Sequence, residues 1–215
     1  MTTLFLVRHG LTGHTGKTLY GRTPGVSLDD RGREQAERLI DRFEGIKIVS
    51  VYSSPLERCV ETVVPLASRL GLPVEPLDGL VEMDPGSWTG RSLAQLKRTR
   101  KWRELHVSPA AFRFPGGEGF VEAQARALDS VYAVTARHPS ANVVMASHGD
   151  VIGMIVAHFG GAHLDQFQRT SVDPASVSVV RLQNGVPLVL LVNDTGGLAR
   201  FAGRRVRPPK RNLRG

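Results

Sequence analysis

The amino-acid sequence predicts an α/β fold: a three-layer sandwich with a mainly parallel sheet, helices on both faces and an antiparallel C-terminal hairpin. Short apolar runs alternate with segments whose apolar residues recur at helical spacing, as at Ala36, Leu39 and Phe43. Alternation of this kind builds a parallel sheet that helices cover on both sides. Near the end of the chain, two apolar runs flank Asn184-Gly185, a pair typical of the tight turn in an antiparallel hairpin.

Apolar runs bounded by turn or capping residues locate the strands. The first of these runs ends directly before Arg8, and a later one ends directly before His148. The expected strands and extended segments cover residues 3–7, 48–52, 73–77, 142–147, 177–182 and 188–192.

Capping residues and helical spacing locate the helices. Asp29 can accept a backbone N–H at the start of the first helix. Ser54 is the expected N-cap of the second helix, with Pro55 at its first helical position, and Pro65 should bend that helix. Further helices are expected at residues 91–101, from Phe120 to Val134, and from the end of the 142–147 strand to Phe159.

The length of 215 residues fits one domain with a substantial core, which we assign to residues 1–202. Residues 78–118 form a long segment between expected strands and helices, and we interpret them as an insertion over the active site. Residues 203–215 are basic, without an acidic side chain, and are expected to be a disordered tail. The tail holds +6 of the total net charge of +8, so residues 1–202 carry only +2.

Composition excludes several classes of protein. The nearly balanced charge of residues 1–202 argues against nucleic acid as a partner, except through the tail. No apolar run approaches the length needed to span a bilayer, and the N-terminus lacks the pattern of a signal peptide. Cys59 is the single cysteine, which suits a reducing cytoplasm. A dimer is compatible with the sequence.

Two apolar runs end in the same way, at His-Gly: LFLVRHG at residues 4–10 and VVMASHG at 143–149. Ligands of parallel sheets bind beyond the carboxyl ends of the strands, so His9 and His148 should emerge at the same rim. The glycine after each histidine lets a ligand or a second backbone approach closely.

Two arginines are expected beside these histidines. Arg58 lies early in a helix, near free backbone N–H groups and the positive end of the helix dipole. Arg8 precedes His9 and can share its site because the chain turns at Gly10. Two guanidinium forks and two imidazoles match a tetrahedral oxyanion such as phosphate. Nearby guanidinium charges should also lower the imidazole pKa and keep His9 neutral and nucleophilic.

In these features the sequence resembles the histidine phosphatase (phosphoglycerate mutase-like) superfamily, and within it the phosphatase branch. The motifs occur in the family's order and span residues 3–182. They are RHG at 8–10 followed by Thr12, LDDRGREQAERL at 28–39, SSPLERCVET at 53–62, GLVEMDPGSWTG at 79–90, PGGEGF at 115–120 and VVMASHG at 143–149.

The resemblance implies a role for each residue of the catalytic site. His9 would be the nucleophile that forms a phosphohistidine. Arg8, Arg58 and His148 would hold the phosphoryl oxygens. Glu82 would protonate the leaving oxygen and then activate water. Positive charge would come from side chains, so no metal or other cofactor is implied. Further substrate contacts would come from Gly149, Thr15 and Gly21.

The chain departs from the family where the mouth of the pocket is expected. Leu11 stands where Glu is usual, and Thr15 where Asn is usual. Leu11 and Tyr20 predict a less polar rim. Lys17 and Arg22 could reach a second anionic group on the substrate.

Other candidate sites have weaker support. Asp84 shares the acidic loop of Glu82, and Glu118 is expected to act only indirectly. The spacing of His158 and His163 disfavours zinc. Cys59 is expected to be a small packed side chain, since a tyrosine-phosphatase nucleophile needs an arginine where Pro65 stands.

These observations favour a metal-independent hydrolase of small phosphomonoesters that acts through a phosphohistidine. A phosphoglycerate-type phosphomutase shares the site and is the first alternative. A non-catalytic binding module that uses the basic tail is the second. The combination of Arg8, His9, Arg58, Glu82 and His148 argues against it.

Overall fold

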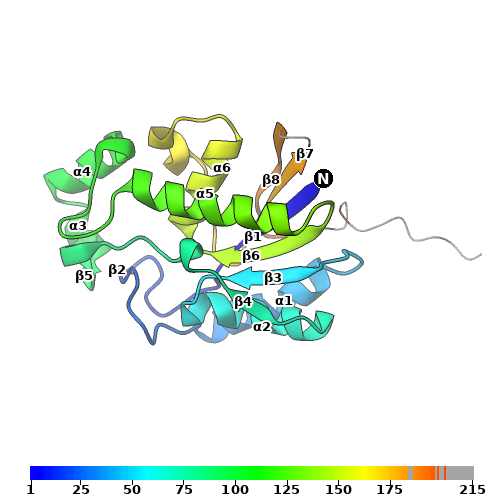
Figure 1. The fold of residues 1–215 in the computed structure, drawn as a ribbon. Coiled ribbons are helices and arrows are strands. Elements are labelled where there is room, and N and C mark those ends of the chain that lie inside the picture. Colours follow the sequence, from blue (N-terminus) through cyan, green and yellow to red (C-terminus); the bar gives the residue numbers. More distant parts are fainter. Residues whose placement is uncertain (184–185, 197, 199–200, 202–215) are drawn as a thin grey trace, which may run out of the picture.

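A computed structural model describes residues 1–183, 186–196, 198 and 201. Its centre is a six-stranded sheet with the strand order β4-β3-β6-β1-β7-β8 (Figure 1). Neighbouring strands from β4 to β1 are parallel, whereas β7 and β8 are antiparallel to their neighbours. The strands are β1 (Thr2–Arg8), β3 (Ser50–Ser53), β4 (Val74–Pro76), β6 (Asn142–Ser147), β7 (Val177–Gln183) and β8 (Val186–Asp194).

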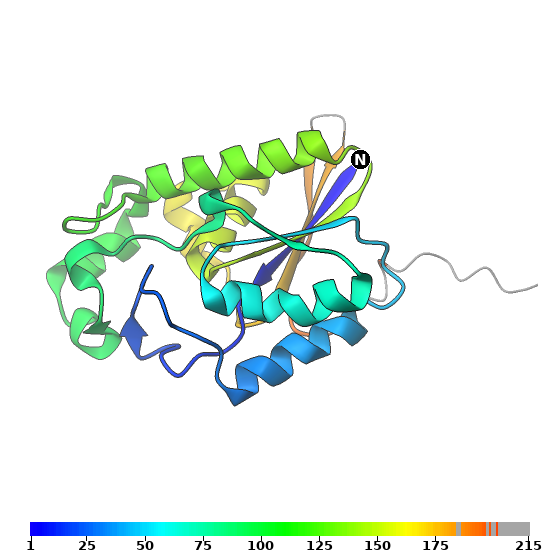
Figure 2. The ribbon, with the colours of Figure 1, turned by 60° about the horizontal axis from the view of Figure 1, so that its bottom comes forward.

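Helices cover both faces of this sheet (Figures 1 and 2). Helices α1 (Asp30–Arg42) and α2 (Glu57–Leu70) pack on one face, and α5 (Phe120–Arg137) and α6 (Gly149–Phe159) pack on the other. The predicted α/β sandwich is therefore confirmed. The expected turn at Asn184-Gly185 and the tail at residues 203–215 lie outside the described residues.

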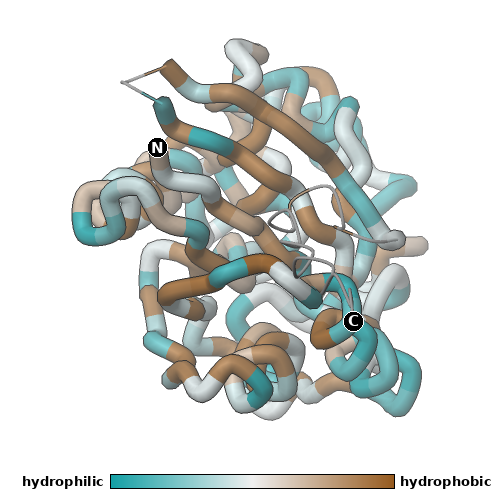
Figure 3. The backbone as a smooth tube through the Cα atoms, turned by 90° about the vertical axis from the view of Figure 1, so that its right-hand side faces the viewer, coloured by the Kyte–Doolittle hydropathy of each residue, from teal (hydrophilic) through white to brown (hydrophobic). Residues whose placement is uncertain are grey.

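The alternation of side chains along β1 explains the two cores. Leu4 and Leu6 point into the core with α5 and α6, whereas Phe5 and Val7 point into the core with α1 and α2. All four side chains are almost completely buried. Strands covered on both faces are apolar along their length, which Figure 3 shows in brown for the central strands.

The start of α1 follows the prediction, and the start of α2 does not. Asp29 caps α1 by accepting a hydrogen bond of 2.8 Å from the N–H of Gly32. Helix α2 has Leu56 as its N-cap and begins at Glu57, so Ser54 and Pro55 precede the helix. The hydroxyl of Ser54 bonds instead to His148. Pro65 lies inside α2, which continues to Leu70.

Residues between β4 and α5 form short elements at one end of the sheet. The expected helix at 91–101 is confirmed only in part: residues 93–96 and 100–101 are helical, but Arg91–Ser92 form β5, which pairs with β2 (Thr18–Leu19). Thr99 then caps a new helix by accepting a hydrogen bond from the N–H of Trp102. The remaining elements are the 3-10 helices η1 (Asp78–Leu80), η2 (Gly86–Trp88), η3 (Pro109–Ala111) and η4 (Leu164–Arg169), and the helices α3 (Leu93–Leu96) and α4 (Arg100–Val107).

Within the described part of the chain, none of the helices is long and apolar enough to cross a membrane.

Candidate active site

The two histidines meet because the strands that carry them are parallel neighbours. Strands β1 and β6 pair in register, with Arg8 opposite Ser147, and both end at the same edge of the sheet. His9 and His148 follow these strands directly, and their ring centres lie 5.3 Å apart. The backbone N–H of His9 donates to the carbonyl of Ser147, which continues the pairing past the strand end.

His9 presents a free ring nitrogen. Its Nδ1 lies 2.8 Å from the carbonyl oxygen of Gly10, and a carbonyl can only accept, so Nδ1 carries the proton. Nε2 then keeps its lone pair. Burial, together with the positive charges of Arg8 and Arg58, lowers the pKa of His9 to about 3. The expected neutral imidazole is therefore supported, with burial rather than the arginines as the larger cause.

Arg58 is a completely buried cation with unused donors. Its Nη2 donates to the carbonyl oxygen of Gly21 at 2.8 Å, and its guanidinium lies 4.7 Å from the centre of the Tyr20 ring. Nε and Nη1 have no acceptor among the residues that the structure describes. A buried guanidinium with two unused donor nitrogens is a site that an anion would satisfy.

Arg8 supplies a second cation next to His9. Its Nη1 donates to the carbonyl oxygen of Val172 at 2.5 Å, and its Nε is buried without an acceptor in the described part of the chain. Gly149 packs against this guanidinium: a Cβ at that position would lie 3.3 Å from Cζ of Arg8. The glycine after His148 thus gives the arginine room.

His148 is neutral and held from both sides of its ring. Nδ1 lies 3.3 Å from Nη2 of Arg58, which can only donate, so the proton sits on Nε2 and is shared with the Ser54 hydroxyl at 2.9 Å. Burial and the charge of Arg58 hold the pKa of His148 well below its usual value. Its 3.6 Å approach to a carboxylate oxygen of Glu82 is therefore a polar contact and not an ion pair.

Glu82 is a carboxylic acid tuned close to neutrality. Burial and the negative charge of Asp150, opposed by Arg58, together raise its pKa to about 7. About a fifth of its side chain remains exposed. Glu82 therefore lies within reach of His148 and can exist in both protonation states near pH 7.

A network of charged side chains fixes the loop that carries Glu82. Arg126 of α5 donates to the carbonyl oxygens of Gly79 at 2.8 Å, Val81 at 2.7 Å and Glu82 at 3.2 Å. Arg22 donates to the same Glu82 carbonyl at 2.8 Å. Both arginines bind Glu118, which therefore acts indirectly, as expected.

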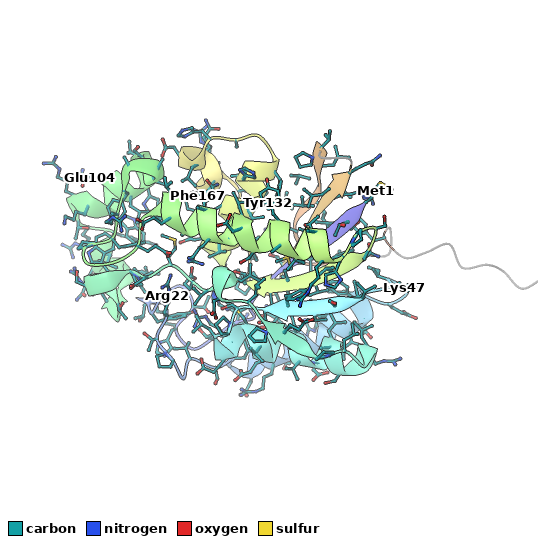
Figure 4. All side chains as sticks on the ribbon, viewed as in Figure 1. Met1, Arg22, Lys47, Glu104, Tyr132 and Phe167 are labelled. Atoms are coloured by element: carbon teal, nitrogen blue, oxygen red, sulfur yellow. The ribbon has the colours of Figure 1, made fainter. Side chains whose placement is uncertain are left out.

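The candidate site includes one cleft of about 420 Å³. Figure 4 shows Phe167, which lines the cleft, near the start of α5, with Arg22 below it. Of the residues singled out in the sequence, Arg58 and His148 lie behind the wall, fully buried. The others line the cleft itself: Arg8, His9, Thr15, Gly21, Glu82 and Gly149.

The structure does not support the expectation that Lys17 and Arg22 reach a second anionic group at the mouth of the cleft. Lys17 donates to the carbonyl of Gly13 and does not line the cleft. Arg22 is engaged with Glu82 and Glu118, so neither cation is placed for a second anionic group. Gly21 orients Arg58 through its carbonyl. Thr15 holds the loop by accepting a hydrogen bond from the N–H of Thr12.

Sequence reasoning missed several residues of the cleft wall. Asp150 lines the cleft, and its position directly after His148-Gly149 was the available signal. Trp102 and His106 also line it, from a helix whose limits were predicted wrongly. Spacing alone gave no sign of their position.

Cys59 is a packed side chain, as predicted. It is completely buried, its thiol donates to the carbonyl of Ser147 at 3.5 Å, and burial raises its pKa to about 12. Within the described residues, no group of three or more His, Cys, Asp or Glu side chains is placed to hold a metal ion.

Comparison with known proteins agrees with this geometry. The chain is 28% identical over 203 residues to phosphoserine phosphatase 1 of Hydrogenobacter thermophilus, covering 94% of this chain and 96% of that protein. It is 31% identical over 207 residues to the bifunctional protein Rv2228c of Mycobacterium tuberculosis, covering 92% of this chain and about half, 55%, of that protein.

Among solved structures, YhfR of Bacillus stearothermophilus superposes with a TM-score of 0.84 at 26% identity, covering 90% of this chain and 98% of that one. The family model of the histidine phosphatase superfamily (branch 1) matches residues 4–195. The fold, the paired His-Gly strand ends and this match together show that the chain belongs to the histidine phosphatase superfamily.

Proposed function

We propose that this protein hydrolyses small phosphomonoesters through a phosphohistidine formed on His9, without a metal ion. The observation that carries the proposal is the free Nε2 of His9 next to two arginines with unused N–H groups. A nucleophile with an available lone pair and a nearby anion site are the two requirements of phosphoryl transfer to histidine.

In the first step, Nε2 of His9 attacks the phosphorus atom and a P–N bond forms. The P–O bond to the alcohol breaks, and the leaving oxygen takes a proton from Glu82. Arg8 and Arg58 stabilise the charge on the transferring phosphoryl oxygens. Nδ1 of His9 keeps its proton and its bond to Gly10, which holds the ring in the productive tautomer.

In the second step, water replaces the histidine. The Glu82 carboxylate, which lost its proton in the first step, accepts a proton from water while the oxygen attacks phosphorus. The P–N bond breaks, inorganic phosphate forms and His9 regains its lone pair. A carboxylic acid with a pKa of about 7 is suited to both directions of transfer.

Hydrolysis is favoured over the phosphomutase alternative by the charges of the cleft. Phosphoglycerates carry a carboxylate as well as a phosphate. Arg8 is the single lysine or arginine among the cleft-lining residues that the structure describes, and Glu82 and Asp150 line the same cleft. A relative named as a phosphoserine phosphatase supports phosphatase activity in this chain.

The test is to trap the intermediate. Rapid mixing with a ³²P-labelled phosphomonoester, followed by an alkaline quench, should leave labelled protein whose label is stable to base and released by acid. His9→Asn should carry no label and lose turnover, whereas His163→Asn, on the exposed cap of η4, should match the wild type.

Phosphate release should equal alcohol release, and no phosphoryl group should pass between phosphoglycerates. Turnover in His9→Asn at the wild-type rate would refute the covalent mechanism. Exchange of 2- and 3-phosphoglycerate faster than phosphate release would instead show the mutase.

A further inference from the structure

We propose that Asp150 makes the enzyme select phosphomonoesters whose alcohol is apolar and carries a protonated amine, and reject those that carry a carboxylate. This inference rests on the proposed phosphatase function and concerns the part of the cleft beyond the phosphate. Asp150 lies in the first turn of α6, two residues after His148, and lines the cleft.

The carboxylate of Asp150 feels the positive charge of Arg8 but is not paired with it. None of the described residues forms a hydrogen bond or ion pair with its side chain. The side chain is exposed where the cleft opens. A carboxylate in the first turn of a helix also stabilises the helix, but that role does not require it to line the cleft.

The wall beside Asp150 adds an acceptor, and Arg8 is the cation whose charge reaches the Asp150 carboxylate. Nδ1 of His106 lies 2.8 Å from the carbonyl of Trp102 and donates to it, so Nε2 is left as an acceptor. Arg8 supplies the one lysine or arginine side chain among the described lining residues, and the phosphoryl group occupies it in the proposed mechanism. A donor or cation on the alcohol is therefore favoured here.

Apolar side chains make up part of the remaining wall, beside the polar residues Thr18, Gln168 and Thr170. The apolar part is made by Leu19, Leu93, Trp102, Phe114 and Phe167. Phe114 and Phe167 are buried, and the other three are half-buried. Apolar side chains of this kind hold an alkyl or aromatic body. Discrimination against a carboxylate therefore depends on the negative charge of Asp150.

Three benzyl phosphates with one scaffold test the proposal: 4-(aminomethyl)benzyl phosphate, 4-methylbenzyl phosphate and 4-carboxybenzyl phosphate. In the wild type, kcat/KM should be about tenfold higher for the amine than for the methyl compound, and about tenfold lower for the carboxylate. Asp150→Asn should reduce the amine-to-carboxylate ratio about tenfold or more.

The ratio within one variant isolates selection from catalysis, because a change in Glu82 acidity acts on all three substrates alike. Asp129→Asn removes the same charge from the exposed face of α5 and should leave the ratio unchanged. Circular dichroism and the melting temperature should show that Asp150→Asn is folded.

The outcomes separate the two proposals. Equal kcat/KM for the three substrates, or an unchanged ratio in Asp150→Asn, would overturn the selectivity and leave the phosphatase function standing. If the enzyme hydrolyses neither the three benzyl phosphates nor p-nitrophenyl phosphate, both the selectivity and the phosphatase function are overturned.

Discussion

Replacing Glu82 by Gln keeps the size of the side chain and removes the proton that the leaving alcohol needs. Burial and the charge of Asp150 raise the Glu82 pKa from 4.5 to about 7, which corresponds to roughly 3 kcal/mol against the ionised form. About half of the wild-type molecules therefore hold the proton at pH 7, and about one in a hundred at pH 9. Since the acid form is the active one, kcat/KM for an alkyl phosphate should fall about tenfold per pH unit above pH 7.

The assay compares two leaving groups in the pre-steady state. Phosphorylation by benzyl phosphate, a poor leaving group, should slow about 10²–10⁴-fold in Glu82→Gln and lose its decline at high pH. Phosphorylation by p-nitrophenyl phosphate needs little proton donation, so its burst of nitrophenol should stay within about tenfold of the wild type. Slow hydrolysis of the intermediate should follow, because the base of the second step is also missing.

Glu37→Gln makes the same replacement on the exposed face of α1 and serves as the control, with no change expected in either burst. An equal loss of burst rate for both substrates would refute the role of Glu82 as general acid. Persistence of the high-pH decline in the variant would refute the assignment of that pKa to Glu82.

Three further substitutions test the support of the site. Arg58→Met should abolish turnover and the thermal stabilisation by vanadate. The melting temperature without vanadate should not fall, because the substitution removes a buried charge with unused donors. A clear fall in that melting temperature would contradict the reasoning. Gly21→Ala should destabilise by about 2–4 kcal/mol in urea, since its Cβ would lie 2.2 Å from Pro85, whereas Gly25→Ala, also at positive φ but in open space, should cost only about 1 kcal/mol. Arg126→Ala should lower the free energy of unfolding by about 2–3 kcal/mol, measured as a lower urea midpoint with an unchanged m-value. An unaltered midpoint would show that the Glu82 loop keeps its position without Arg126.

The positions of the two histidines in the site were predictable because both histidines directly follow the ends of strands. Parallel strands put their carboxyl ends at one edge, so the His-Gly motifs at His9 and His148 had to meet there. The low pKa of the histidines was predictable in direction. Its main cause was not, because the depth at which a side chain is buried is a property of the whole fold.

The walls of the cleft were predicted less well because tertiary contacts decide them. Ser54 precedes Pro55 in a pattern typical of a helix start, but its hydroxyl binds His148, and the helix begins later. Arg126 resembles any polar residue on an amphipathic helix, yet it holds three carbonyls of the Glu82 loop. No local pattern distinguishes such residues from a solvated surface.

The predicted helix at 91–101 was confirmed only in part, for a similar reason. Arg91–Ser92 pair with Thr18–Leu19, so a segment of helical composition begins as a strand. Thr99 then caps a second helix, α4, which places Trp102 on the cleft.

The phosphoryl end of the cleft and the alcohol end have different origins in the fold. His9 and His148 are fixed by hydrogen-bonded strands, whereas Leu19, Leu93 and Trp102 stand on short elements outside the main sheet. Variants made to change which alcohol is accepted can therefore concentrate on residues 17–19 and 91–114 and leave the chemistry intact. Libraries built on this division should keep far more active members than libraries that alter the strand ends.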